Sequence, residues 1–153
     1  AHRQGVDPSR IVYKKPLKME AHLGCHRHAD LFLDTLPYNA HTTASDALWT
    51  GLPVLTCMGS TFAGRVAASL LHAIGLPELI THSMTEYEAL AVYLATHPEA
   101  LAAIRTKLAR HRDSHPLFDT PRFCQHIERA YEMMWQRHRR GEPPASIVVP
   151  RLP

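Results

Sequence analysis

A short apolar run that leads into a threonine-rich turn constrains this sequence most. Residues 30–34 (DLFLD) form an apolar block with a carboxylate at each end, which predicts a buried β-strand. Residues 44–49 then have a helical pattern that the following GLP sequence ends. Thr42 and Thr43 therefore stand where a loop leaves a strand and begins a helix. Free backbone N–H groups, hydroxyl groups and a positive helix dipole would suit such a turn to phosphate.

The same two threonines also allow a simpler interpretation. Threonine is a common helix N-cap, and Thr42 or Thr43 would then serve only to begin the helix. Local spacing alone favours this interpretation over a phosphate site, and both stay open on local grounds.

Strand and helix patterns alternate through the first half of the chain. Strands are predicted at residues 11–13, 31–34, 54–57 and 79–80, and helices at 19–29, at 44–49 and from about 60 to 74. Residues 1–4 predict the last turn of a helix closed by Gly5, so we expect the chain to begin inside something larger. This alternation is typical of an α/β fold with parallel strands joined by right-handed crossovers.

The second half of the chain is predicted to be helical. Ser83 and Glu86 predict a capping box, in which Glu86 reaches back to the Ser83 N–H. Further helices are predicted from Pro98 and from Thr120, the last ending near Gly141. Its apolar stripe consists of Phe123, Ile127, Ala130, Tyr131, Met134 and His138. We therefore predict one partial domain with a nucleotide-binding half at 1–82, C-terminal helices at 83–141 and a tail at 142–153.

Composition narrows the class of protein. The chain has 153 residues with 45% hydrophobic and 20% charged content, ordinary values for a globular domain or part of one. No apolar run has the length of a membrane span and no signal-peptide pattern opens the chain, so a cytoplasmic protein without a membrane partner is expected. Three widely spaced cysteines favour a reducing compartment. The basic residues between 101 and 141 alternate with apolar ones without base-stacking aromatics, which favours a solvated helix face over nucleic acid.

The sequence gives little support for a metal site, a cysteine nucleophile or a hydrolase serine. The densest histidine cluster, Cys25-His26-Arg27-His28, has no second cluster with ligand spacing, so no metal site is expected. No cysteine stands beside a predicted base. The serines at 45, 60 and 69 lack the flanking glycines of a hydrolase nucleophile.

Several segments, taken in order, match one known family. They are DLFLDT at 30–35, NAHTTASDALWTGLPV at 39–54, RVAAS at 65–69, ELI at 78–80, PLFDT at 116–120 and YEMMW at 131–135. With no large gaps from residue 10 to 150, they resemble the C-terminal catalytic lobe of the O-linked N-acetylglucosaminyltransferase family. Ala44, in place of a glycine, indicates a bacterial-type relative.

The resemblance implies a Rossmann-like sheet with flanking helices, the C-terminal lobe of a GT-B glycosyltransferase. It implies inverting transfer of N-acetylglucosamine from UDP-GlcNAc to serine or threonine hydroxyls of proteins, without a metal or other cofactor. The implied partners are UDP-GlcNAc or UDP, a protein acceptor and the remaining N-terminal lobe of the same enzyme.

The resemblance also assigns to residues of this sequence roles in binding the sugar donor, UDP-GlcNAc. Leu17, Lys18 and Met19 would read the uracil edge and contact the ribose, and the ring of His22 would stack on the base. His41, Thr42 and Thr43 would bind the diphosphate. Asp46 would bind the ribose hydroxyls, and Tyr38 and Asn39 would lie near the sugar.

The sequence departs from the family at some of these positions. Cys25 stands where the family often has an arginine that reaches the uracil, and Tyr38 is larger than expected beside the sugar. The family's proposed catalytic histidine and phosphate-binding lysine belong to segments before residue 1. No catalytic residue is therefore assigned, and this chain alone is not expected to turn over. Two alternatives remain: a GT-B enzyme for another sugar or acceptor, and a non-catalytic module that binds a protein through its basic helical face.

Overall fold

Three short parallel strands form the sheet of the computed structural model, which describes residues 2–150. They are β1 (Phe32–Leu33), β2 (Val54–Cys57) and β3 (Ile80–Thr81), in the order β1-β2-β3. Phe32 pairs with Val54, and Thr56 pairs with Ile80. All residues of β2 are buried, as expected for the central strand of a parallel sheet. The predicted parallel α/β fold and three of its four strands are confirmed.

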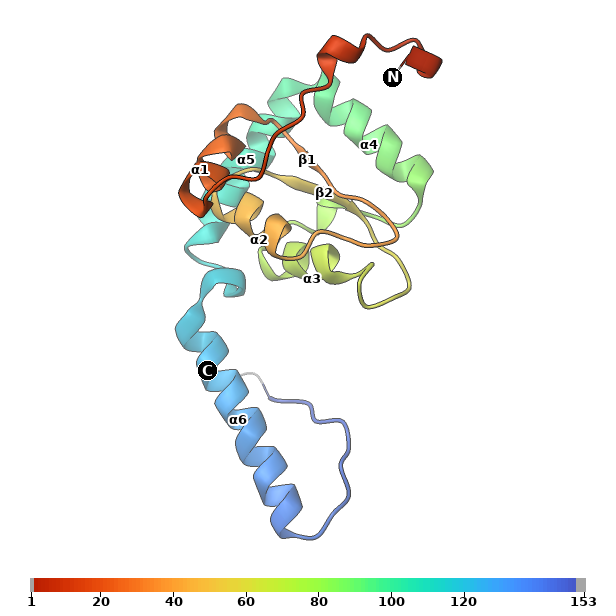
Figure 1. Cartoon of the computed structure of the whole chain (residues 1–153). Helices are drawn as coiled ribbons and strands as arrows, with labels where there is room; N and C mark the ends of the chain where they lie inside the picture. Colours follow the sequence, from red (N-terminus) through yellow and green to blue (C-terminus); the bar gives the residue numbers. More distant parts are fainter. Residues whose placement is uncertain (1, 151–153) are drawn as a thin grey trace.

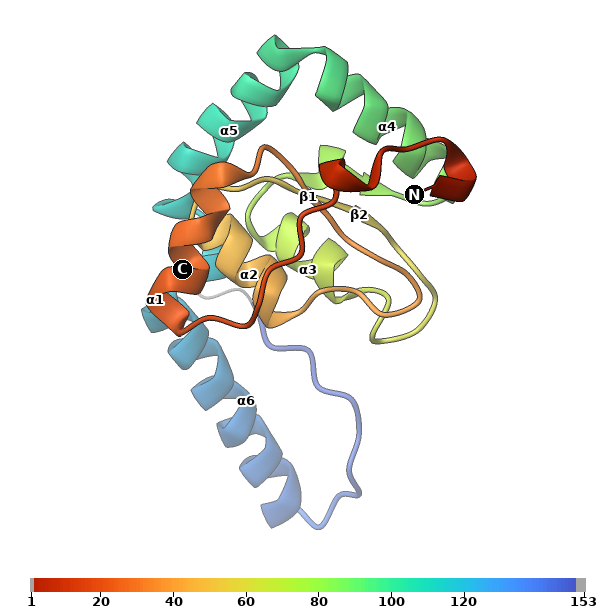
Figure 2. The same cartoon turned by 45° about the horizontal axis from the view of Figure 1, so that its top comes forward.

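Helices cover both faces of this sheet (Figures 1 and 2). α2 (Thr42–Trp49) and α3 (Val66–Ala73) lie on one face, and α4 (Met84–Thr96) lies on the other. α5 (Pro98–Arg112) follows α4 and also contacts α2. Between these elements lies the core, whose largest buried apolar side chains include Leu48, Val54, Leu55, Leu71, Ile74, Leu76, Leu79, Leu94 and Leu108.

The strand predicted at residues 11–13 is wrong. These residues lie in an extended segment without strand pairing, and the side chains of Val12 and Tyr13 are among the most exposed apolar ones. A β-branched segment becomes a strand only beside a sheet edge, and the described chain brings none to it. The helical turn predicted before Gly5 is present as a 3₁₀ turn at His2–Gln4, although Ala1 lies outside the described residues.

The helix predicted at residues 19–29 is shorter than expected. α1 (Met19–Cys25) continues as a 3₁₀ turn at His26–His28 and ends there. The helix predicted from about residue 60 likewise begins only at Val66, because residues 59–64 form a closed loop with a Gly59 N–H bond to the Gly64 carbonyl of 2.7 Å.

The capping box before α4 is half correct. The Ser83 hydroxyl accepts a hydrogen bond from the Glu86 N–H at 3.2 Å, as predicted. The Glu86 carboxylate, however, accepts from the N–H of His82, at 2.9 Å, instead of that of Ser83. The side chain has reached one residue further back, and it still satisfies an N–H group ahead of the helix.

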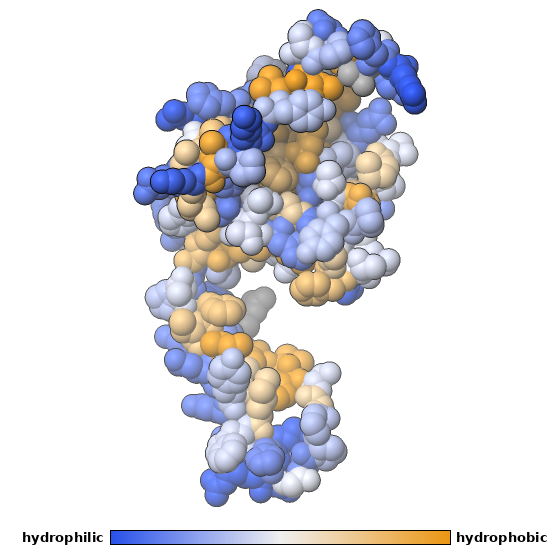
Figure 3. Space-filling model, viewed as in Figure 1, coloured by the Kyte–Doolittle hydropathy of each residue, from blue (hydrophilic) through white to orange (hydrophobic). Residues whose placement is uncertain are grey.

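The last helix, α6 (Thr120–Arg139), extends away from the α/β body (Figure 1). None of its residues is buried, and Tyr131 and Met134 of its apolar stripe are 61% and 50% exposed. The surface view shows apolar residues along this helix and the adjoining tail (Figure 3). Much of the apolar stripe is therefore exposed in this chain.

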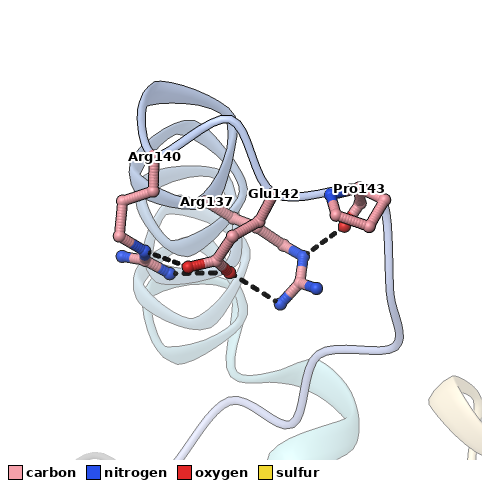
Figure 4. Close-up of polar contacts among 4 residues, drawn as sticks. All are labelled: Arg137, Arg140, Glu142 and Pro143. Carbon is pink, nitrogen blue, oxygen red and sulfur yellow. Dashed lines mark hydrogen bonds and ion pairs between the residues drawn. The ribbon is translucent and has the colours of Figure 1, made fainter.

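The tail turns back beside α6 after Gly141 (Figure 1). Two arginines of the helix end hold this turn (Figure 4). Arg140 forms an ion pair with Glu142 at 2.5 Å, and Arg137 donates to the Pro143 carbonyl at 2.5 Å. The hydrogen bond from Arg140 lowers the pKa of the Glu142 carboxyl. Among residues 2–150, no helix is both long and apolar enough to cross a membrane.

Candidate functional site

The loop from β1 to α2 is anchored by a buried carboxylate at the carboxyl end of the sheet. Asp34 is buried, and its two oxygens accept hydrogen bonds from the Ala40 N–H and the Thr56 hydroxyl, both at 2.7 Å. The Tyr87 hydroxyl donates to the Asp34 carbonyl at 2.8 Å. These bonds fix the loop in front of α2. Ligands of open α/β sheets bind at this edge, beyond the carboxyl ends of the strands.

The start of α2 is open. His41 precedes the helix and its side chain forms no capping hydrogen bond, while the first intrahelical bond runs from the Ser45 N–H to the His41 carbonyl. Thr42 and Thr43 are the first two helical residues, and both are exposed. The first turn carries no acidic residue that would compensate the helix dipole. The simpler interpretation, a capping threonine, is therefore wrong, and the helix start is free to receive an anion.

A histidine–carboxylate pair lies one helical turn further along α2. Nε2 of His22, on α1, is 3.6 Å from Oδ2 of Asp46. His22 also meets the ring of His26 edge-on, with ring centroids 5.0 Å apart. Four residues of helix rise about 6 Å, so Asp46 lies about one helical turn along α2 from Thr42. The order of these groups along α2 fits a nucleoside diphosphate.

α1 is attached to α2 through a second contact. Nδ1 of His26 lies 2.9 Å from the hydroxyl of Thr50, which itself donates to the Asp46 carbonyl at 2.9 Å. Burial, and next the neighbouring His22, lower the pKa of His26, while Asp46 acts in the opposite direction. This contact holds α1 against α2, and it thereby helps to place the His22 ring beside Asp46.

The three other donor-binding candidates lie just before and at the start of α1. Lys18 is the residue before the helix, and its carbonyl accepts a hydrogen bond from the His22 N–H at 2.9 Å. Leu17 and Met19 are exposed. The structure therefore brings this segment next to His22, although it shows no contact that would identify a uracil edge.

A small cavity adjoins the helix start. It measures about 370 Å³ and is lined by Phe32, Leu33, Asp34, Thr35, Tyr38, Asn39, Ala40, His41 and Thr43. Asn39 is only 1% exposed; its amide donates to the Thr35 carbonyl at 3.0 Å, and its Oδ1 has no partner among residues 2–150. Tyr38 is exposed at the rim and stacks on His41.

Two residues near this cavity were missed by the sequence prediction. The sequence predicts Asp34 only as the end of a strand, although a carboxylate at that edge, ahead of the loop that leads to a threonine-led helix, also indicates a loop anchor. Phe62 carries no signal in the sequence, since its contact with the His41 ring depends on how two loops meet.

Side chains of the cluster at residues 25–28 contact other side chains of the protein. Arg27 donates to Nε2 of His28 at 3.2 Å, and His26 contacts Thr50. Within the described range, no three histidine, cysteine or acidic side chains are placed to hold an ion together.

Comparisons with known proteins point to one family. The sequence model of glycosyl transferase family 41 matches residues 1–127. A UDP-N-acetylglucosamine–peptide N-acetylglucosaminyltransferase of Caenorhabditis elegans is 41% identical over 140 residues, 92% of this chain and 12% of that protein. The SEC protein of Arabidopsis thaliana, described as a probable enzyme of the same name, is 40% identical over 150 residues, 97% of this chain and 15% of that protein.

A solved structure agrees with these matches. A mutant O-GlcNAc transferase of Thermobaculum terrenum superposes with a TM-score of 0.83 at 36% identity, covering 88% of this chain and 26% of that one. The predicted fold class, a Rossmann-like lobe of a GT-B glycosyltransferase, is confirmed by this match. The chain thus spans only about an eighth to a quarter of the proteins that it matches.

Proposed function

The chain belongs to glycosyl transferase family 41, and we propose that it supplies the UDP-GlcNAc-binding portion of a larger protein O-GlcNAc transferase. The observation that supports this most is the open start of α2, where Thr42 and Thr43 are exposed beside the His22–Asp46 pair. The transfer is inverting and needs no metal. The acceptor is a serine or threonine hydroxyl of a protein.

The chemistry of such a transfer explains what the helix start would do. The acceptor oxygen attacks the anomeric carbon from the face opposite the diphosphate, while the bond from this carbon to the β-phosphate oxygen breaks. UDP leaves with developing negative charge. The Thr42 and Thr43 hydroxyls, the first N–H groups of α2 and the His41 ring donate to that charge. The proton of the acceptor goes to a base outside this chain.

The ribose and uracil of UDP-GlcNAc lie along α2, on the side that faces α1. Asp46 accepts hydrogen bonds from the ribose hydroxyls, and the ring of His22 stacks on the uracil. The backbone at Leu17, Lys18 and Met19 reads the uracil edge. Tyr38 and Asn39 lie on the sugar side of the diphosphate, at the cavity beside Thr43.

The exposed stripe of α6 fits the remainder of the same enzyme. Tyr131 and Met134 of this stripe remain 61% and 50% exposed, although the tail after Gly141 turns back beside the helix. In the proposed enzyme the N-terminal lobe covers them, because a stripe of this size is otherwise costly to leave in water. The acceptor protein approaches the cleft between the two lobes.

Calorimetry on the full-length protein tests the proposal. UDP and UDP-GlcNAc should bind with the same affinity in buffer and in excess chelator, and GDP should bind more weakly because its base differs. Affinity that disappears with the chelator would contradict the metal-free site. Absence of UDP binding would favour the non-catalytic module, and equal affinity for UDP-glucose and UDP-GlcNAc would favour a GT-B enzyme for another sugar.

A further inference from the structure

The imidazole of His41 lies between two aromatic rings from two different loops. The Tyr38 ring, in the loop from β1 to α2, stacks on it with centroids 4.9 Å apart and planes 16° apart. The Phe62 ring, in the loop from β2 to α3, meets it edge-on at 6.1 Å and 89°. Both geometries are favourable arrangements of aromatic pairs.

Packing, not hydrogen bonding, holds the buried side of this imidazole. Nε2 of His41 is buried and has no hydrogen-bond partner within residues 2–150. In functional histidines, a hydrogen bond to one ring nitrogen usually sets the orientation of the ring and leaves the other nitrogen to act. His41 makes no such bond at Nε2, so contacts with the two aromatic rings set the orientation of its imidazole instead.

The two loops are joined at this point. The Asn39 N–H donates to the Ala63 carbonyl at 2.9 Å, and Asn39 and Ala63 are the neighbours of Tyr38 and Phe62 in the sequence. The Gly64 N–H donates to the Thr61 hydroxyl at 3.1 Å and closes the second loop on itself. The aromatic side chains therefore reach His41 from backbones that are fixed relative to each other.

We infer that Tyr38 and Phe62 are positioning residues, which hold the His41 ring at the start of α2 so that it meets the donor diphosphate. This inference rests on the proposed function. It gives Tyr38 a role through His41 in place of a direct contact with the sugar. Phe62 gains a role that the sequence did not suggest.

The exposure of the two rings separates this role from a purely structural one. Tyr38 is 64% exposed and Phe62 is 75% exposed, so neither belongs to the core. Large apolar side chains so exposed contribute little to folding, and their removal should leave the fold intact. The ring of His41 is the aromatic contact that the two side chains share.

The test compares UDP with uridine, which lacks the phosphates, by calorimetry on the full-length enzyme. Tyr38→Ala and Phe62→Ala should each weaken UDP binding about two- to tenfold, the range that one aromatic pair provides. Uridine affinity should not change. Tyr38→Phe, which keeps the ring, should restore most of the loss. Tyr93→Ala is the matched control, because Tyr93 also stacks on a histidine, His97, at 4.2 Å on α4, away from the site.

Variants in a His41→Ala background decide between positioning and direct contact. There, Tyr38→Ala and Phe62→Ala should cause no further loss of UDP affinity. A loss that persists without His41 would mean that the rings touch the donor themselves, and it would overturn the inference. Equal weakening of uridine would overturn it too, by showing general damage to the site. Wild-type enzyme that binds no UDP would reject the proposed function itself, whereas normal UDP binding by Tyr38→Ala would reject only the positioning role.

Discussion

Nε2 of His22 lies 3.6 Å from Oδ2 of Asp46, and this pair joins α1 to α2 beside the proposed diphosphate site. The distance is long for a hydrogen bond, so the carboxylate remains available to a ligand. A ribose placed there would meet an acceptor for its hydroxyls and, beside it, a flat ring for its base. The pair thus connects two roles that the family resemblance assigns separately.

The first prediction concerns Asp46. Asp46→Asn in the full-length enzyme should weaken UDP binding roughly 10- to 100-fold, since hydrogen bonds to a charged group contribute about 1.5–3 kcal/mol. Calorimetry with 2′,3′-dideoxy-UDP is the control, because this ligand has no ribose hydroxyls for Asp46 to accept from. Its affinity should be the same for both proteins. An equal loss for both ligands would place the carboxylate elsewhere.

The second prediction concerns the ring of His22. His22→Ala should cost about 1–3 kcal/mol of UDP affinity, the contribution of an aromatic ring stacked on a base, and His22→Phe should retain much of it. The exposed His28, in the 3₁₀ turn after α1, supplies the control: His28→Ala should bind UDP normally. Negligible losses for both His22 variants would show that the ring lies outside the site.

The third prediction concerns Gly75, which ends α3 with φ +73°. A Cβ there would lie 2.6 Å from the ring of His115 and 2.8 Å from that of His111, so Gly75→Ala adds steric overlap to backbone strain. Gly141 is the matched control, because it has φ +69° and open space around it. Gly141→Ala should lower the free energy of unfolding by about 1–2 kcal/mol, and Gly75→Ala by about 1–3 kcal/mol more.

Thermal unfolding measures both Gly→Ala variants. Gly75→Ala combined with His115→Ala should recover part of the loss, because the nearest ring is then gone. Similar melting temperatures for Gly75→Ala and Gly141→Ala would show that the two rings move aside at no cost.

The fourth prediction concerns pH and the stacked rings of His111 and His115, whose centroids are 3.7 Å apart. Burial, then His111, then Lys107 lower the pKa of His115. Nδ1 of His111 lies 2.9 Å from the Ile74 carbonyl, and Lys107 forms an ion pair with Glu78. The unfolded chain therefore binds a proton at His115 more readily than the folded chain, so the free energy of unfolding falls as pH drops below about 6.5.

Urea unfolding at pH 7.5 and pH 5.5 checks this effect. The wild-type protein should lose stability at the lower pH, and His115→Phe should lose less, because it keeps a ring on Gly75 and has no proton to bind. His26, whose pKa is also lowered, remains in both proteins and accounts for part of the residual pH dependence. Identical pH dependence in the two proteins would exclude a contribution from His115.

Local patterns predicted most of the elements because their causes are local. Residues 54–57 (VLTC) favour a strand and are all buried, and they form β2 as predicted. The helix predicted at 44–49 begins two residues earlier, at Thr42, with His41 as the residue before it. The strand at 11–13 failed because strand formation depends on a neighbouring strand, which a short sequence window does not contain.

The side-chain geometry of the site could be predicted only in part. The resemblance brought His22 and Asp46 into one site, and the structure places them together. The sequence does not predict the contact of Phe62 with His41, because this contact depends on the hydrogen bond between the loops at Asn39 and Ala63. The packing of His111 and His115 on Gly75 likewise joins residues far apart in the chain.

The fifth prediction concerns Thr42 and Thr43, whose interaction with the diphosphate should strengthen as the glycosidic bond breaks. UDP leaves with growing negative charge, and in a metal-free site that charge needs donors already placed where it develops. The structure leaves both threonines exposed on a helix start that has no acidic residue in its first turn. Asp46, one turn later, lies next to His22 and away from this role.

The Thr42→Ala, Thr43→Ala double variant of the full-length enzyme, assayed for turnover and for UDP affinity, tests this. Turnover should fall more than UDP affinity, because only the transition state draws fully on the two hydroxyls. In oxyanion sites, the loss of one such donor raises the activation barrier by about 2.7–4 kcal/mol. The rise expected per hydroxyl here is at most of this size, because the N–H groups of α2 remain. Wild-type turnover would reject the proposal. A loss confined to UDP affinity would reduce both threonines to ground-state binding groups, since donors that act on the leaving group must change the rate of bond cleavage.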